Sequence, residues 1–366
     1  MTNISDFHIA VLPGDGIGAE ITEPCLGLLE AAAARVGGLG FRFDTLAGGA
    51  GYYRDHGESM PKTTRETAGK ADAILLAAMG DPAIRYADGT EITPQIEMRF
   101  LLGLYAGVRP VRSIAGVSGP LADPRAHALD FVLIRESTEG LFASYGKGEV
   151  GPDEARDTQV ITRKGSERLF RFAFHLAGQR KAAGAPGVVT CIDKANVFKS
   201  MAFFREIFDA IATEFPGLGA NHAYVDAIAL EFVRRPWTFD VLVTENMFGD
   251  ILSDLGAGLI GGLGMAPSAD IGDDHAVFQP CHGSAPDIAG KGLANPAAMI
   301  LSGAMMLDWL GQEHGRESAM NAAALIRDAV DTAFSTGLRS VEFGGNDGTE
   351  RIAGAVMTAL DEARTP

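Results

Sequence analysis

The chain alternates short apolar runs with longer segments in which apolar residues recur every three or four positions. The short runs have the length and composition of buried strands, and they are HIAVL (8–12), AILLAAM (73–79), FVLI (131–134), GVVTCID (187–193) and FDVLVTE (239–245). The longer segments predict amphipathic helices at 21–36, 166–184, 201–215, 321–334 and 351–363. Strands that alternate with helices in this way predict an α/β fold.

One polar segment interrupts this alternation. Residues 144–163, SYGKGEVGPDEARDTQVITR, are punctuated by glycine and end in the alternating QVIT. The pattern is typical of a hairpin that projects from the body of the protein. It is either a surface loop or a protruding arm that pairs with a second subunit.

Composition and charge narrow the class of protein. The 366 residues are enough for two domains, and 46% apolar with 21% charged residues indicates a folded globular enzyme. A net charge of −16 with scattered Lys and Arg argues against a nucleic-acid partner or an anionic membrane surface.

The expected compartment is the cytoplasm. The N-terminal MTNISDFH has no basic region followed by an apolar run, and no segment reaches the roughly 18 to 20 apolar residues of a membrane span. Cys25, Cys191 and Cys281 are far apart and lack metal-ligand spacing, which favours a reducing environment.

A glycine loop follows the first predicted strand in VLPGDGIGAEI (11–21), where Gly14, Gly16 and Ala19 have G-x-G-x-x-A spacing. One interpretation is the Rossmann fingerprint, in which such a loop binds the pyrophosphate of a dinucleotide. A metal-free hydroxy-acid dehydrogenase would use the loop in this way.

Three aspartates are candidate ligands of a divalent cation. In TENMFGDILSD, Asp250 and Asp254 are four residues apart on one face of a predicted helix, where they either favour the helix dipole or bind a hard cation. Asp226 is surrounded by apolar residues in HAYVDAIALEF, and a half-buried carboxylate there needs a metal or another cation.

Basic residues provide further candidates. Lys194, at the end of a predicted strand in CIDKANV, is either a catalytic base or the partner of Asp193 in a salt bridge. Arg99, Arg109 and Arg135 could together bind a dicarboxylate through bidentate hydrogen bonds, although each taken singly is typical of the surface.

A second loop, PCHGSAPDIAGKGLANP (280–296), precedes a predicted helix. Its backbone N–H groups suit an anion or the edge of an adenine. Asp287 could accept hydrogen bonds from a ribose diol, which favours NAD over NADP. The alternative is a purely structural turn.

Taken together, the motifs LPGDGIG, R-x9-RP, VDA-x-A, DKANV, TEN-x-FGDILSD and HGSAPDIAGKG-x-ANP resemble the metal-dependent β-decarboxylating dehydrogenases. That family includes 3-isopropylmalate dehydrogenase and relatives that act on isocitrate, homoisocitrate, tartrate and D-malate. The resemblance implies two α/β domains that share a large mixed sheet, which is not a Rossmann sheet. It assigns 1–104 and 258–366 to a cofactor-binding domain and 105–257 to a substrate, metal and dimerisation domain that carries the arm at 144–163.

The resemblance also implies an activity, the oxidative decarboxylation of a 2-hydroxy dicarboxylic acid by NAD with Mg²⁺ or Mn²⁺ in a homodimer. The implied substrate-binding residues are Arg99, Arg109, Arg135, Gln95 and Val197. The implied metal ligands are Asp250, Asp254 and the partner subunit's Asp226, and Lys194 reaches across the dimer to assist removal of the C2 hydroxyl proton. The implied cofactor-binding residues are Asn196 near the nicotinamide and His282, Gly283, Ser284, Ala285, Asp287 and Asn295.

Two positions depart from the family pattern. Phe142 stands where the family usually has a Tyr that supplies the final proton, so the proton would come from Lys194 through water or from Tyr145. Gln279 replaces a Glu. Residues before Arg99 match neither the isopropylmalate nor the isocitrate pattern. We expect a 3-isopropylmalate-like substrate, with D-malate, tartrate, isocitrate or homoisocitrate as alternatives, and a catalytically weakened regulatory relative as a further one.

Overall fold

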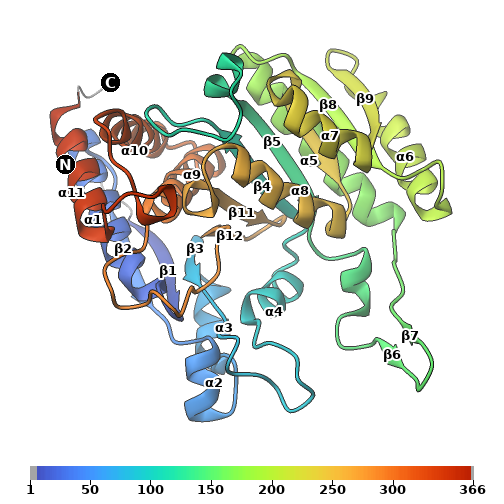
Figure 1. Cartoon of the computed structure of the whole chain (residues 1–366), viewed down its shortest axis with the longest axis horizontal. Helices are drawn as coiled ribbons and strands as arrows, with labels where there is room; N and C mark the ends of the chain where they lie inside the picture. The colour runs from blue at the N-terminus through green and yellow to red at the C-terminus, as the bar shows by residue number, and fades with distance from the viewer. Residues whose placement is uncertain (1–5, 364–366) are drawn as a thin grey trace.

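A computed structural model describes residues 6–363, and a ten-stranded mixed sheet crosses that part of the chain (Figure 1). The strands lie in the order β2-β1-β3-β12-β11-β4-β5-β10-β8-β9. β11 is antiparallel to β12 and β4, β4 is antiparallel to β5, and the other neighbours are parallel. The strands are β1 (Phe7–Gly14), β2 (Phe41–Thr45), β3 (Ala73–Ala78), β4 (Ala106–Arg112), β5 (Asp130–Glu136), β8 (Val188–Asp193), β9 (Gly219–Tyr224), β10 (Val241–Thr244), β11 (Pro267–Ile271) and β12 (Ala276–Pro280).

The predicted hairpin exists, and Figure 1 shows it projecting from the body of the molecule. It pairs β6 (Glu149–Val150) with β7 (Ala155–Arg156), so its strands precede QVIT, and the prediction was wrong on this point. The turn between them is closed by a hydrogen bond from the Gly151 N–H to the Glu154 carbonyl, which sets the register. Val160 instead forms an isolated bridge to Gly140.

Helices cover both faces of the sheet, and all five predicted helices are present. The helices are α1 (Gly18–Val36), α2 (Ala50–His56), α3 (Lys62–Ala68), α4 (Pro94–Leu101), α5 (Arg163–Ala182), α6 (Lys199–Ala212), α7 (Val225–Arg234), α8 (Asn246–Leu259), α9 (Ala297–Glu313), α10 (Glu317–Ser335) and α11 (Thr349–Glu362). Short 3₁₀ turns are η1 (Pro124–Ala128), η2 (Leu141–Ser144), η3 (Pro236–Thr238), η4 (Leu263–Met265) and η5 (Val341–Phe343).

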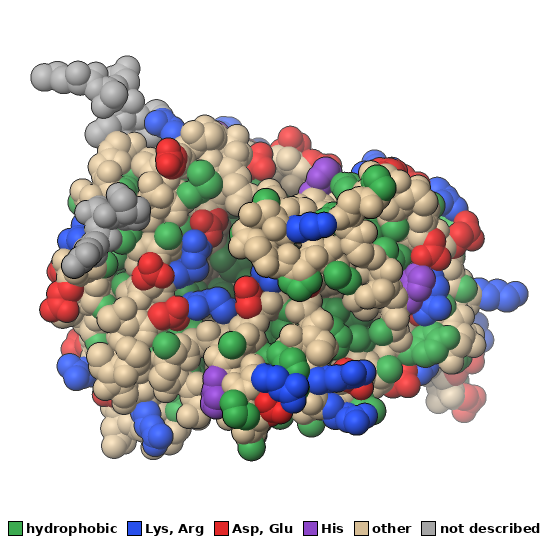
Figure 2. Space-filling model, turned by 90° about the horizontal axis from the view of Figure 1, so that it is seen from above, with side chains coloured by type: hydrophobic (Ala, Val, Ile, Leu, Met, Phe, Trp, Pro, Cys, Tyr) green, Lys and Arg blue, Asp and Glu red, His purple; other side chains and the backbone are tan. Residues whose placement is uncertain are grey.

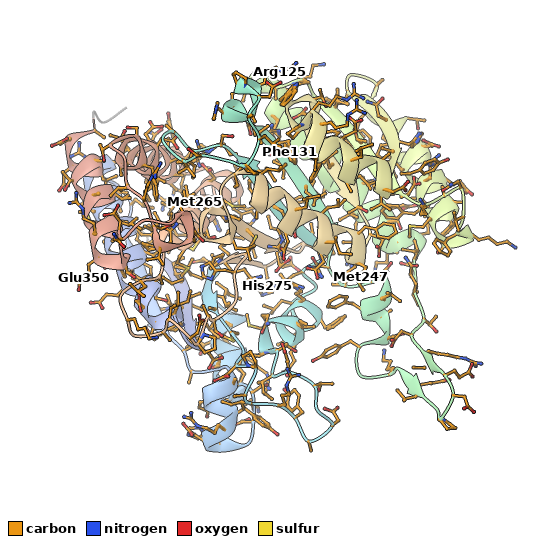
Figure 3. All side chains as sticks on the ribbon, in the orientation of Figure 1. Arg125, Phe131, Met247, Met265, His275 and Glu350 are labelled. Carbon is orange, nitrogen blue, oxygen red and sulfur yellow. The ribbon has the colours of Figure 1, made fainter. Side chains whose placement is uncertain are left out.

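The alternation of side chains along β5 explains how two cores form. Phe131, labelled in Figure 3, and Leu133 belong to the core beneath α7 and α8. Val132 and Ile134 point to the other face and join the core beneath α5 and α6, which continues to α1 and α9–α11. Since successive residues of a strand face opposite sides, four consecutive apolar residues serve both layers.

A third core, which includes Ala68 of α3 and Met98 of α4, lies on the same face of the sheet as α7 and α8. Polar side chains lie on this face between the two helix groups. Arg109 shares its face of β4 with Val111, Arg135 follows Leu133 on β5, and Gln279 follows Val277 on β12. The gap between the helix groups thus leaves polar sheet residues available for a site.

The first glycine loop is filled by protein contacts. A Cβ at Gly14 would lie 1.8 Å from the Ala78 carbonyl oxygen. The Asp15 carboxylate accepts hydrogen bonds from the N–H groups of Ala50 (2.7 Å), Gly51 (2.8 Å) and Gly80 (2.8 Å). These contacts and the mixed strand order contradict the Rossmann interpretation, in which the strands are parallel and the loop faces a pyrophosphate.

The surface and the cysteines add two observations. Figure 2 shows Lys, Arg, Asp and Glu side chains intermingled on one face of the molecule. None of the helices within residues 6–363 combines the length and apolar character that crossing a bilayer requires. Cys25, Cys191 and Cys281 are free thiols, and burial raises the pKa of Cys25 to about 12.

Candidate active site

A cavity of about 170 Å³ opens where Arg109, Arg135 and Gln279 line the sheet between the two helix groups. Its volume lies below the roughly 300 to 1,000 Å³ of drug-sized ligand pockets, so it suits a small molecule. It brings together many of the residues expected from the sequence: Gln95, Arg99, Arg109, Arg135, Asp250, Asp254, His282 and Gly283. Residues 76–79, Ser253 and residues 279–281 complete the lining.

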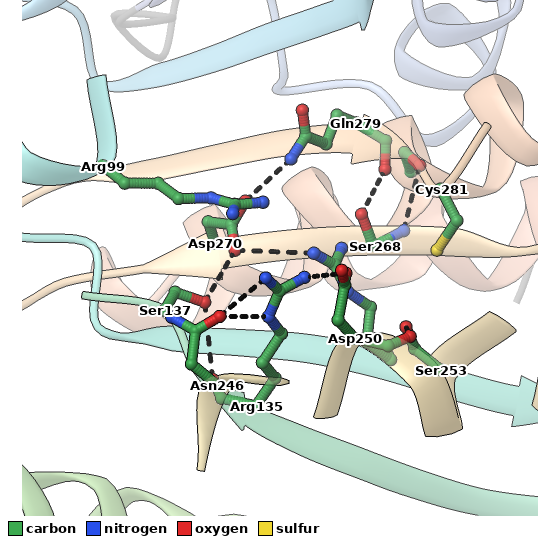
Figure 4. A network of polar contacts seen from close by, with 12 residues as sticks. Arg99, Arg135, Ser137, Asn246, Asp250, Ser253, Ser268, Asp270, Gln279 and Cys281 are labelled. Atoms are coloured by element: carbon green, nitrogen blue, oxygen red, sulfur yellow. Dashed lines mark hydrogen bonds and ion pairs between the residues drawn. The ribbon is translucent and has the colours of Figure 1, made fainter. Parts of the chain in front are cut away.

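A buried carboxylate, Asp270 on β11, holds two of the arginines (Figure 4). The Nε and Nη2 atoms of Arg99 each lie 3.1 Å from Asp270 Oδ2, and Arg109 Nη2 lies 3.6 Å from Oδ1. Ser137 Oγ donates to Oδ1 at 3.2 Å, and Gln279 Nε2 donates to Oδ2 at 2.7 Å. The arginine cluster therefore rests on a fixed anion below the cavity.

Arg135 is held by α8 instead. Its Nε and Nη2 donate to Asn246 Oδ1 at 3.1 and 2.7 Å, and its Nη1 contacts the Asp250 carboxylate. Burial and the neighbouring charge of Arg99 lower the pKa of Arg135 to about 10. Its guanidinium carbon lies 5.3 Å from the ring centre of Phe142, within the range of a cation–π contact.

Asp250 and Asp254 both line the cavity from α8. The side chain of Glu245 caps this helix by accepting from the N–H groups of Met247 and Phe248. The helix begins at Asn246, so both aspartates lie beyond the first turn, where the dipole effect fades. The dipole alternative is therefore wrong. Burial and the charge of Asp250 raise the pKa of Asp254, a strain that a cation between the two carboxylates would relieve.

Lys194 and Asp226 are paired with each other in one chain. The Asp226 side chain is 67% exposed, so the prediction of a half-buried carboxylate was wrong for a single chain. Asp193 binds Arg205 at 2.7 and 2.8 Å, which contradicts the alternative of a salt bridge with Lys194. Across residues 6–363, no three His, Cys, Asp or Glu side chains lie close enough to hold a metal, so Asp226 does not join Asp250 and Asp254 within one chain.

The loop between β8 and α6 lies outside the cavity lining. Val197 is 59% exposed, and Asn196 is also exposed. In the described chain, neither residue contributes to the walls around the arginines. Any contact of this loop with a substrate would require a second subunit or a movement of the chain.

A second cavity, of about 250 Å³, lies beside residues 280–296, which we call the histidine loop. Ile17, Leu263, Ile288, Leu293 and Val341 give it apolar walls, and its polar lining includes His282, Asn295, Ser340 and Glu342. Asn295 is buried and donates to Glu342 Oε1 at 2.9 Å. Ala285 also lines it, whereas Asp287 is exposed and Ser284 donates to the Gly80 carbonyl.

His282 lines both cavities. Its Nδ1 lies 2.9 Å from the Gly283 carbonyl oxygen and must carry the proton, which leaves Nε2 as an acceptor. That Nε2 atom is buried and has no hydrogen-bond partner. Burial lowers the pKa of His282, which keeps the ring neutral. Arg109 Nη1 and Gln95 Oε1 are likewise buried without partners, so donors and acceptors are available for a ligand.

Three residues were missed by sequence reasoning: Glu342, which lines the second cavity, and Asp270 and Asn246, which hold the arginines of the first. Asp270 carries a signal, because an acidic residue between Ala269 and Ile271 interrupts an apolar strand. Asn246 belongs to the TEN-x-FGDILSD motif, although no role was assigned to it, and Glu342 carries no signal, since turn η5 brings it to the site only in the folded chain.

Comparison with known proteins gives a consistent result. Residues 8–356 match the family described as Isocitrate/isopropylmalate dehydrogenase. The 3-isopropylmalate/3-methylmalate dehydrogenase of Methanocaldococcus jannaschii is 42% identical over 97% of this chain and 99% of its own. The probable tartrate dehydrogenase/decarboxylase of Bacillus subtilis is 37% identical over 98% and 99%, respectively.

Solved structures agree in fold. The isocitrate dehydrogenase from Methylococcus capsulatus has a TM-score of 0.83 and 36% identity, with 97% of this chain and 100% of that chain covered. A β-decarboxylating dehydrogenase from Thermococcus kodakarensis in its apo form has a TM-score of 0.79 and 36% identity, with 97% and 96% covered.

Proposed function

Because the chain belongs to the isocitrate/isopropylmalate dehydrogenase family of β-decarboxylating dehydrogenases, we propose that it oxidises and decarboxylates a 2-hydroxy dicarboxylic acid with NAD and Mg²⁺ or Mn²⁺. The observation that carries this proposal is one small cavity lined by three arginines and by Asp250 and Asp254. Guanidinium groups suit carboxylates, and paired carboxylates suit a hard divalent cation.

Arg99, Arg109 and Arg135 would hold the two carboxylates of the substrate. The unpartnered Nη1 of Arg109 supports this role, because a buried donor without a partner costs free energy until a ligand accepts from it. The Asp250 contact of Arg135 would open when a substrate carboxylate takes its place. Phe142 would cover the Arg135 guanidinium and exclude water from it.

The donor set fits a divalent cation. Asp250 and Asp254 would hold it together with the partner subunit's Asp226, and the raised pKa of Asp254 supports this role. When bound, the cation supplies Lewis-acid stabilisation of negative charge on the substrate oxygens. Lys194 of the other chain would accept the C2 hydroxyl proton. Since Phe142 has no hydroxyl, we propose that Lys194 and a water molecule return the final proton.

The second cavity fits the adenosine half of NAD. Its apolar walls suit an aromatic base, and the unpartnered Nε2 of His282 can accept from an exocyclic amine. Gly283, Ser284, Ala285, Asp287 and Asn295 would frame this part of the cofactor, and Asn196 would approach the nicotinamide. Glu342 would repel the additional phosphate of NADP, which supports NAD.

A homodimer would complete the site. The exposed apolar side chains Leu230 and Val233 on α7 and Ile251 on α8 support an interface there, close in sequence to Asp226 and Asp250. Such a dimer would carry the Lys194 and Asp226 of each chain to the cavity of the other. We further propose the two domains expected from the sequence, with a boundary between β11 and β4, and a cytoplasmic location that fits the free thiols.

The substrate substituent has two candidates. A 3-isopropylmalate-like substrate is supported by the relatives at about 40% identity. A more polar substrate, such as D-malate or tartrate, is supported by Gln95, whose Oε1 atom is buried without a partner and would accept from a substrate hydroxyl.

The test is NADH formation by the purified chain with 3-isopropylmalate, D-malate, tartrate or isocitrate. Each assay is run with Mn²⁺, with EDTA, and with NADP in place of NAD. We expect NADH formation with at least one dicarboxylate that stops with EDTA. The same rate in EDTA would contradict the proposed requirement for a divalent metal. The absence of NADH formation with every substrate would contradict the proposed function.

A further inference from the structure

Asp270 lies in a row of residues that spans three strands. In the sheet register, Asp270 on β11 pairs with Gly107 on β4, and Gly107 pairs with Arg135 on β5. A Cβ on Gly107 would lie 2.7 Å from Ser137 Oγ and 3.2 Å from Asp270 Oδ1. The glycine therefore leaves the space in which the Asp270 carboxylate faces the arginine cluster.

The Asp270 carboxylate is buried and remains charged. Its side chain is 1% exposed. Burial raises the pKa of Asp270, but the charges of Arg99, Arg109 and Arg135 together lower it by more, so it lies below the ordinary value. Asp270 is thus a buried anion beneath the cavity at neutral pH, in contact with two of the arginines that line it.

The side chains at the cavity balance in charge. Arg99, Arg109 and Arg135 contribute three positive charges, and Asp250, Asp254 and Asp270 contribute three negative charges. A divalent cation and a doubly charged anion would leave this balance unchanged. A triply charged anion would add one negative charge in a region of low dielectric, where unpaired charge is costly.

We propose that Asp270 is a specificity-determining residue that makes the cavity accept a dicarboxylate and reject a tricarboxylate. Asp270 occupies the Nε and Nη2 edge of Arg99 and lies beside Nη2 of Arg109. It is in effect a resident third carboxylate that takes the guanidinium edges a tricarboxylate would need. This inference rests on the proposed function, because it concerns the charge of the substrate of that site.

Gln279 is the second residue that contributes to this proposed specificity. Residues Ser268 and Gln279 are paired across β11 and β12, so Gln279 is the diagonal neighbour of Asp270 on the same face. Its amide donates to Asp270 Oδ2 at 2.7 Å. A Glu at this position would place a second carboxylate against the first, whereas the amide of Gln279 stabilises the Asp270 carboxylate by donating to it.

The test compares an unreactive dicarboxylate, succinate, with an unreactive tricarboxylate, tricarballylate. Their dissociation constants are measured by calorimetric titration of the purified full-length protein with Mg²⁺ and without NAD. The wild type should bind succinate more tightly than tricarballylate. Asp270→Asn should shift the ratio of the two dissociation constants by about tenfold or more toward tricarballylate, because one negative charge beside two guanidiniums is removed. If Asp270 only held the arginines in place, both probes would weaken equally and the ratio would stay constant.

Asp240→Asn is the matched control. Asp240 is also buried, and it accepts from Arg180 Nε at 2.7 Å and from the Gly187 N–H at 2.7 Å, but its partner Arg180 does not line the cavity. This variant should leave the probe ratio unchanged. Gln279→Glu gives a second variant if Asp270→Asn fails to fold, and it should shift the ratio further against tricarballylate. The double variant Asp270→Asn, Gln279→Glu should return the ratio toward the wild-type value.

The outcomes separate this inference from the proposed function. An unchanged ratio in Asp270→Asn and Gln279→Glu, or equal binding of the two probes by the wild type, would overturn the role of Asp270 even if the protein reduces NAD. The predicted shifts without NADH formation from any substrate would support the role of Asp270 and overturn the proposed function alone.

Discussion

Gly16 lies against the carbonyl oxygen of Ser284 so closely that a Cβ on Gly16 would be 2.0 Å from that oxygen. The Ile17 N–H donates to the same carbonyl at 2.8 Å. The glycine loop after the first strand and the histidine loop after β12 therefore brace each other. Of the glycines that resemble a dinucleotide fingerprint, Gly16 serves the contact between these two loops, and Gly14 packs against Ala78 of β3.

This contact predicts the effect of Gly16→Ala. Gly16 has φ +56°, which disfavours a side chain, and the new Cβ would meet backbone that cannot easily move. We expect the free energy of unfolding to fall by about 2 kcal/mol or more. Gly27→Ala in α1 is the control, because its Cβ meets nothing within 4 Å and should stabilise the helix by about 0.5 to 1 kcal/mol. Urea denaturation measures the free energy of unfolding of both variants. Equal values for Gly16→Ala and Gly27→Ala would contradict the contact between the two loops.

Phe142→Tyr should keep or raise the rate of decarboxylation. The ring would remain over Arg135, and the added hydroxyl could supply a proton. Phe142→Leu should lower kcat/KM several-fold, since a cation–π contact is worth about 0.5 to 2 kcal/mol. Tyr145→Phe is the control. The Tyr145 hydroxyl is engaged with Thr93 Oγ1 at 2.9 Å, so its removal should leave the rate of decarboxylation nearly unchanged. Steady-state kinetics of NADH and CO₂ release measure all three, and a loss above tenfold in Tyr145→Phe would assign the proton to Tyr145.

Mixing two inactive variants tests whether two subunits share each site. Lys194→Ala and Asp254→Asn should each abolish turnover. When the two proteins are unfolded together and refolded, each mixed dimer should contain one intact site, so activity should recover to roughly a quarter of the wild type. Each variant refolded alone provides the baseline. Mixtures that stay at this baseline would show that Lys194 and Asp254 act within the same chain.

The depressed pKa of His282 predicts a dependence of stability on pH. Burial lowers the pKa of His282 below its ordinary value of 6.5, so below pH 6.5 the unfolded chain takes up a proton that the folded chain does not. Stability should therefore fall between pH 7.5 and pH 5.5, with a contribution from this group of at most about 1.4 kcal/mol per pH unit.

The measurement is the free energy of unfolding at both pH values. His282→Gln should show a smaller difference between the two values than the wild type does. His127→Gln, which changes an exposed histidine, should keep the wild-type difference. If the free energy of unfolding of His282→Gln differs between the two pH values by as much as that of the wild type, His282 is not the group that titrates.

Particular residues show how far the sequence alone could go. The apolar run FVLI predicts a buried strand, which is β5, and the structure divides its four residues between two cores. The motifs predict that Arg99, Arg109, Arg135, Asp250 and Asp254 matter, and the structure places all five around one cavity. The alternative of a salt bridge between Lys194 and Asp193 was wrong, because Asp193 is paired with Arg205 on the next helix.

Local patterns of hydrophobic and polar residues determine helices and strands because they depend on neighbours a few positions apart. The motifs indicate candidate residues for the chemistry, and the family resemblance assigns their expected roles. The tertiary structure alone decided that Asp270 and Gln279 would meet beneath Arg99, 171 residues from Asp270 along the chain. Such contacts depend on strand order and register, which are set by the packing of the whole sheet and leave no local trace in the sequence.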